Sequence, residues 1–100
     1  MSDWSSPVNT VRLTSSGAIS AGPSKVLSIY FVSDTTAGSI TIKDGGSSGT
    51  SLAVFDTPVG GSSAGEPAFY QIDLPGLGLR CETSAYATLS NVDMVTVIYG

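Results

Sequence analysis

Histidine is absent from this sequence of 100 residues, and Cys81 is its only cysteine. The chain therefore lacks the side chain that proteins use most often as a general base near neutral pH and as a metal ligand. A Ser–His–Asp triad or a Cys–His pair cannot be built within one such chain. A single cysteine also excludes an internal disulfide. We therefore predict a protein that is not an enzyme, with no catalytic residues, no cofactor and no metal site.

Charge is also scarce, because charged residues make up 12 % of the chain, about half the usual share of a soluble domain. The four cations, Arg12, Lys25, Lys43 and Arg80, are scattered and stand against eight acidic residues, which gives a formal net charge of −4. Binding to nucleic acid requires cations clustered on one face, and so does binding to an anionic membrane surface. We therefore expect no nucleic-acid partner and no membrane partner.

Long apolar runs are missing as well. No stretch approaches the roughly 20 apolar residues of a membrane span. Residues Met1 to Val11 include Asp3 and no apolar run, so we expect synthesis in the cytosol without a signal peptide. The polar character comes instead from 17 serines and 10 threonines. Hydroxyl groups cost less to bury than charges do, so such a surface favours association with a partner.

The apolar residues, 41 % of the chain, gather in short β-branched and aromatic runs separated by Gly, Pro, Ser, Asp and Asn. No segment shows the i, i+3, i+4, i+7 spacing of an amphipathic helix over two turns. Short strands with turn residues between them, repeated about every 8–12 residues, are typical of a sandwich or small barrel. We predict an all-β antiparallel sandwich, jelly-roll or Ig-like, with seven or eight strands.

The expected strands are Val11–Leu13, Lys25–Val32, Ser39–Lys43, Ser51–Phe55, Ala68–Leu74, Leu79–Thr83, Tyr86–Ser90 and Met94–Tyr99. The nearly continuous apolar character of Lys25–Val32 predicts burial on both of its faces, or one face in the core and one against a partner. A bulge is expected near Ser84–Ala85, and Asp44–Gly49 reads as a glycine-rich hairpin loop. The last strand, Met94–Tyr99, is expected in the centre of a sheet. We predict an N-terminal arm over residues 1–10 and one sandwich domain over residues 11–100.

Few residues remain as candidates for chemistry. Cys81 lies next to Arg80, which would favour a reactive thiolate, but a small buried side chain is the simpler interpretation. A pair of carboxylates could act as acid and base, or loop carboxylates could bind calcium, but no spacing singles out a pair or a calcium loop. The carboxylates considered are Asp44, Asp56, Glu66, Asp73, Glu82 and Asp93.

The aromatic residues are the better candidates for binding. Trp4 lies in a polar arm outside any predicted strand, so it requires a pocket on its own domain or on a neighbour, and tryptophan is a favoured interface anchor. The four tyrosines could form a sugar-binding face, or they could pack in the core and at its rim with their hydroxyls in water. We take Trp4, Tyr30 and Tyr99 as candidate interface residues. The tyrosines are Tyr30, Tyr70, Tyr86 and Tyr99.

Four stretches of the predicted strands and turns, taken in order along the chain, resemble the sequences of a known group of proteins. The segments read V-L-S-I-Y-F-V, then A-G-S-I-T-I-K-D-G-G-S-S-G-T-S-L, then I-D-L-P-G-L-G-L-R-C, then A-Y-A-T-L-S-N-V-D-M-V-T-V-I-Y-G. Over about Lys25–Gly100, and most specifically over Ile42–Gly46 and Leu89–Gly100, the chain resembles small structural proteins of tailed bacteriophages, of the capsid decoration or cement type. The resemblance implies a β-sandwich, often trimeric or otherwise oligomeric, bound to the outside of a capsid.

From the resemblance and the composition we expect a virion structural protein, made in the host cytoplasm and located in the virion. Its expected partners are the major capsid protein or another virion protein, together with further copies of itself. The alternative is a binding module of a fibre or other surface assembly, which recognises carbohydrate or a receptor through the tyrosines and the loop Val59–Glu66. The family has no catalytic residues to carry over.

Overall fold

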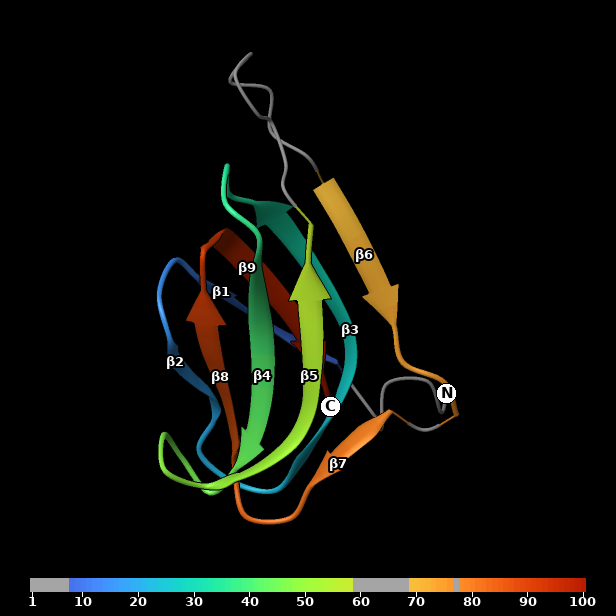
Figure 1. Ribbon diagram of the computed structural model, residues 1–100. Helices are drawn as coiled ribbons and strands as arrows, with labels where there is room; N and C mark the ends of the chain where they lie inside the picture. Colours follow the sequence, from blue (N-terminus) through green and yellow to red (C-terminus); the bar gives the residue numbers. More distant parts are fainter. Residues whose placement is uncertain (1–7, 59–68, 77) are drawn as a thin grey trace.

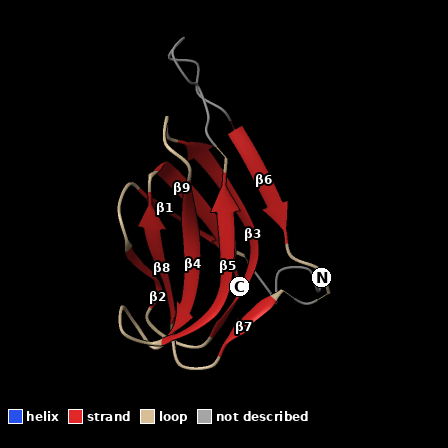
Figure 2. Ribbon diagram, viewed as in Figure 1, coloured by secondary structure: helices blue, strands red, loops and turns tan. Residues whose placement is uncertain are grey.

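The computed structural model describes residues 8–58, 69–76 and 78–100, and within them it contains nine strands and no helix (Figure 2). The all-β prediction is confirmed. The additional strand is the second one, whose sequence G-A-I-S has only one large apolar side chain and so gives almost no periodicity. The strands are β1 (Asn9–Leu13), β2 (Gly17–Ser20), β3 (Ser24–Ser33), β4 (Gly38–Asp44), β5 (Thr50–Thr57), β6 (Phe69–Asp73), β7 (Leu79–Cys81), β8 (Ala85–Ser90) and β9 (Val92–Tyr99).

The strands form two antiparallel sheets that face each other (Figure 1). Sheet A has the order β1-β9-β3-β6, with β7 also paired to β3, and sheet B has the order β2-β8-β4-β5. With β6 and β7 taken as halves of one interrupted strand, the pairs nest around the β4–β5 turn as β4·β5, β3·β6/β7, β2·β8 and β1·β9. A long hairpin folded over on itself in this way is a jelly roll, one of the two predicted architectures.

Strands β3 and β9 are the centre of sheet A. The last strand, β9, lies between β1 and β3, as the sequence predicted for the C-terminal strand. In β3, Val26, Ile29 and Phe31 are buried in the core, and Val32, which points to the opposite face from Phe31, is only 6 % exposed. Tyr30, on the same outer face as Val32, is 36 % exposed, so the inner face of β3 is buried and its outer face is only partly buried.

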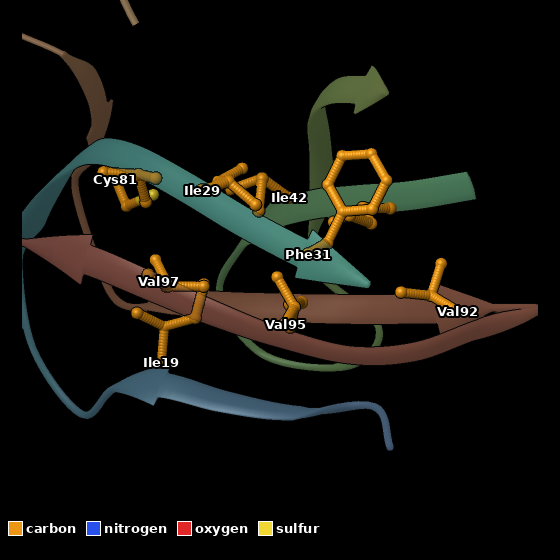
Figure 3. Close-up of a cluster of buried hydrophobic side chains, with 12 residues drawn as sticks. Ile19, Ile29, Phe31, Ile42, Cys81, Val92, Val95 and Val97 are labelled. Carbon is orange, nitrogen blue, oxygen red and sulfur yellow. The ribbon is translucent and has the colours of Figure 1, made fainter. Parts of the chain in front are cut away.

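The core fills the space between the two sheets (Figure 3). Sheet A contributes Phe31 and a row of β-branched side chains from β3 and β9, whereas sheet B contributes smaller side chains from β8 together with Ile40 and Ile42. Phe31 is the largest of the fully buried side chains. The buried cluster consists of Ile19, Val26, Ile29, Phe31, Ile40, Ile42, Cys81, Ala85, Ala87, Val92, Val95 and Val97.

Two local predictions have different outcomes. The Asp44–Gly49 segment is a hairpin loop between β4 and β5, in which Gly45 and Gly46 have positive φ angles of 104° and 94° that glycine adopts without strain. The bulge expected near Ser84–Ala85 is instead the point at which the chain passes from β7 in sheet A to β8 in sheet B.

Strand β1 begins at Asn9, so the last two residues of the predicted arm belong to the sandwich.

Candidate functional site

The three predicted interface residues do not form one site. Trp4 lies outside the described residues. Tyr30, on β3, is 36 % exposed on the outer face of sheet A. Tyr99, on β9, is opposite Asn9 and Val26 in register and is half-buried against the core, on the inner face of the same sheet. Tyr30 and Tyr99 therefore point to opposite sides of sheet A.

The four tyrosines likewise do not share a face. Tyr86 lies opposite Lys43 in sheet B, on the outer face of that sheet. Tyr70, on β6, stacks on the core residue Phe31 with ring centroids 5.3 Å apart, so it lines the inner face of sheet A at its rim. The tyrosine-only sugar-binding face is thus not assembled, because residue identity alone does not fix which face a strand residue occupies.

The outer face of sheet A carries a different aromatic pair. Tyr30 on β3 stacks with Phe69 on β6, with ring centroids 6.1 Å apart and an angle of 13° between the ring planes. Phe69 is 59 % exposed, the largest exposed fraction among the big apolar side chains of the described residues. Because stacking covers only part of each ring, the pair leaves apolar ring surface exposed to solvent.

Polar side chains continue this surface along the same two strands. Ser28 lies opposite Asp73 in register, and Tyr30 lies opposite Gln71. The Ser28 hydroxyl donates a hydrogen bond of 2.9 Å to Asp73 Oδ1, and Gln71 Nε2 donates to the same oxygen at 3.0 Å. We call these five residues the aromatic–polar patch: Ser28, Tyr30, Phe69, Gln71 and Asp73.

The hydrogen bonds within the aromatic–polar patch stabilise the charged form of Asp73. The Gln71 amide and then the Ser28 hydroxyl hold the pKa of the Asp73 carboxyl below its ordinary value. The carboxylate is therefore ionised at neutral pH and accepts hydrogen bonds. Gln71 is oriented by its contacts with Asp73 and with Ser28 Oγ, the latter at 3.4 Å.

The outer face of sheet B is chemically different. Its central rows pair hydroxyl side chains across strands, with Thr88 opposite Thr41 and Ser90 opposite Ser39. Its edge strand β5 adds the exposed aliphatic side chains of Leu52 and Val54, which are 37 % and 58 % exposed. We call this surface the hydroxyl face, and its residues are Ser39, Thr41, Lys43, Ser51, Leu52, Val54, Asp56, Tyr86, Thr88 and Ser90.

Asp44 has a structural role. Its carboxylate accepts hydrogen bonds from the backbone amides of Glu82, Thr83 and Ser84, at 3.0, 2.8 and 3.2 Å. The amides of Thr83 and Glu82 contribute most to lowering the pKa of the Asp44 carboxyl. The side chain thereby fixes the turn at which the chain passes from sheet A to sheet B.

The other residues predicted as candidates for chemistry do not form a site among the described residues. Cys81 is fully buried, and burial raises the pKa of its thiol, with a further contribution from the negative charge of Asp44. The interpretation of Cys81 as a small buried side chain is therefore confirmed. Glu66 and the loop Val59–Glu66 lie outside the described residues. Within residues 8–58, 69–76 and 78–100, no three His, Cys, Asp or Glu residues are grouped so that they could hold a metal ion.

Two residues of the aromatic–polar patch, Phe69 and Gln71, were not predicted from the sequence. The available signal was the alternation in Ala68–Leu74, which places Phe69, Gln71 and Asp73 on the face opposite to Tyr70 and Ile72. The apolar residues of this segment, Tyr70, Ile72 and Leu74, indicated only which of its faces is turned to the core. The adjacency of Tyr30 and Phe69 depends on the pairing of β3 with β6, which no local pattern reveals.

Comparison with known proteins identifies no relative. No family model matches the chain, and neither a curated protein nor a solved structure matches it. Among the described residues, no helix is long and apolar enough to cross a membrane.

Proposed function

We propose that the chain is a structural protein of a bacteriophage particle, which decorates the outside of the capsid and stabilises the head shell. The hydroxyl face is the observation that carries the proposal. Across its three central rows the charged side chains are Lys43 and Asp56, one of each sign, so the surface has no net charge. A surface of this kind stays hydrated in the free protein and is desolvated at low cost against a shell.

The edge of the hydroxyl face supplies the apolar part of the contact. Val54 lies opposite Thr41 in register and is more than half exposed. Leu52 lies two residues before Val54, at the bulge of β5. Two aliphatic side chains beside rows of hydroxyls resemble the apolar centre and polar rim of a protein–protein interface. The proposed partner is therefore the major capsid protein or another virion protein.

Further copies of the chain are the second proposed partner. Resemblance to the decoration proteins of tailed phages implies an oligomer, such as a trimer, and many copies on one shell permit each contact to be weak. The low charge of the chain supports close approach of copies, because few like charges have to be brought together.

Add-back to particles tests the proposal. Particles assembled without the chain are mixed with the purified protein, and bound copies are counted by mass spectrometry and seen by negative-stain microscopy. We expect saturable binding and survival of the particles to a higher temperature. Val54→Glu, which places a charge in the apolar part of the contact, should abolish binding, whereas Phe69→Ala on the opposite sheet should not. Equal particle stability with no bound copies would reject the proposal.

The aromatic–polar patch favours a second candidate, a receptor- or carbohydrate-binding module of a fibre or other surface assembly. The location of the protein separates the two candidates. Antibody labelling of intact particles should decorate the head if the first proposal holds, and the fibres or tail if the second does.

A further inference from the structure

The aromatic–polar patch has the composition of a ligand site on an otherwise hydroxyl-rich molecule. Phe69 and Tyr30 leave 59 % and 36 % of their surfaces in water, at an energetic cost that a ligand would remove by covering them. They lie beside each other on β6 and β3, the two strands at this edge of sheet A in Figure 1. The two rings are nearly parallel and stacked on each other, and we call the apolar surface that they leave exposed the aromatic platform.

Hydrogen-bonding groups flank the platform in a fixed orientation. Asp73 Oδ1 accepts from Ser28 and Gln71, which holds the carboxylate and the amide in place. Asp73 Oδ2 and the Gln71 side-chain oxygen have no hydrogen-bond partner among the described residues. Two oriented acceptors are therefore available next to the aromatic platform.

The spacing suits an elongated ligand. Phe69, Gln71 and Asp73 alternate along β6 on one face, so the backbone positions of Phe69 and Asp73 are about 14 Å apart at roughly 3.4 Å per residue, with Tyr30 opposite Gln71 between them. A sugar has C–H groups on the faces of its ring and hydroxyl donors around its edge. The C–H groups match the negatively polarised face of an aromatic ring, and the hydroxyls match oriented oxygen acceptors.

We propose that the aromatic–polar patch binds a neutral saccharide, with a sugar ring packed against the exposed ring surfaces of Phe69 and Tyr30 and hydroxyls donating to Gln71 and Asp73. An apolar protein side chain fits less well, because it would bury the Asp73 carboxylate without giving it a hydrogen bond. The negative charge of Asp73 also disfavours sugars that carry a carboxylate. The inference rests on the second candidate function and is independent of capsid attachment, since it uses the sheet opposite to the hydroxyl face.

Binding is tested on a glycan array with the full chain presented in many copies, and then by NMR titration with the sugars that bind. We expect selective binding of neutral glycans, with resonance shifts confined to β3 and β6. Phe69→Ala and Asp73→Asn should each weaken binding at least about tenfold. Val54→Ala, an equally exposed change on the hydroxyl face, should leave it unchanged.

The outcomes separate this inference from its alternatives. Circular dichroism and the melting temperature confirm that each variant is folded before its binding is compared. No binding to any neutral glycan, or binding that Phe69→Ala and Asp73→Asn leave unaltered, would overturn the inference. Light scattering in which Phe69→Ala dissociates an oligomer would also overturn it, because the patch would then be an interface between copies. Capsid attachment can fail its own test without changing any of these results.

Discussion

The backbone amide of Thr83 donates a hydrogen bond of 2.8 Å to Asp44 Oδ1, which joins the turn after β7 to the end of β4. Glu82 and Ser84 donate to the same carboxylate. The three bonds form at the point where the chain leaves one sheet for the other. The Asp44 side chain, from the middle of the sequence, therefore holds in place the turn between β7 and β8 near the C-terminus.

We expect Asp44→Asn to lower the melting temperature at pH 7 by on the order of 5 °C, because an amide oxygen accepts these bonds without the negative charge. The pKa of Asp44 is lowered by folding from its ordinary value of 3.8. Its contribution is therefore complete above about pH 4 and is lost as the pH falls through the lowered pKa. Urea unfolding between pH 2 and pH 7 should show a weaker acid dependence in Asp44→Asn than in the unaltered protein. Equal dependence in the two proteins would contradict the role assigned to Asp44.

Gly38 is required by close packing against the turn before β9. A β-carbon at this position would overlap the carbonyl oxygen of Ser90 and lie 2.7 Å from Cβ of Asn91. We expect Gly38→Ala to destabilise the fold by about 2–4 kcal/mol, since backbone has to move. Gly22→Ala is the matched control, because nothing lies within 4 Å of its β-carbon, and it should be neutral or stabilise by up to about 1 kcal/mol. Urea unfolding measures both, and similar effects at the two positions would refute the argument.

Val95 and Val54 allow the same substitution in two environments. Val95 is completely buried in the core, whereas Val54 is 58 % exposed on the hydroxyl face. We expect Val95→Ala to cost about 2–3 kcal/mol, from lost burial and from the cavity left behind. Val54→Ala should change the free energy of unfolding by no more than about 0.5 kcal/mol. A large loss for Val54→Ala would mean that the outer face of β5 is packed against something in the protein as purified.

Cys81 should be unreactive in the native protein. Its side chain is fully buried, and the raised pKa of the thiol keeps it protonated. We expect a disulfide reagent at pH 8 to label Cys81 only as fast as the protein opens, and to label it at once in urea. Cys81→Ser should destabilise the fold by about 1–3 kcal/mol if the buried hydroxyl finds no partner. Rapid labelling of the folded protein would show that the thiol is accessible.

The sequence determined the class of fold and several of its local features. Alternation in segments such as Ser39–Lys43 gave strands with Ile40 and Ile42 turned to the core, because side chains of a strand point to opposite faces in turn. The glycines after Asp44 indicated the β4–β5 hairpin, since they tolerate positive φ. These features depend only on residues that are close together along the chain.

Tertiary structure alone decided which aromatic and polar side chains share a face of the molecule. Tyr30 and Phe69 are 39 positions apart in the sequence, and they meet only because β6 pairs with β3 across the folded hairpin of the jelly roll. The same pairing places Ser28 against Asp73, and the change of sheet at Ser84 separates β8 from β7. Local periodicity indicates that a strand has two faces. What each face packs against depends on how the whole chain folds around its core.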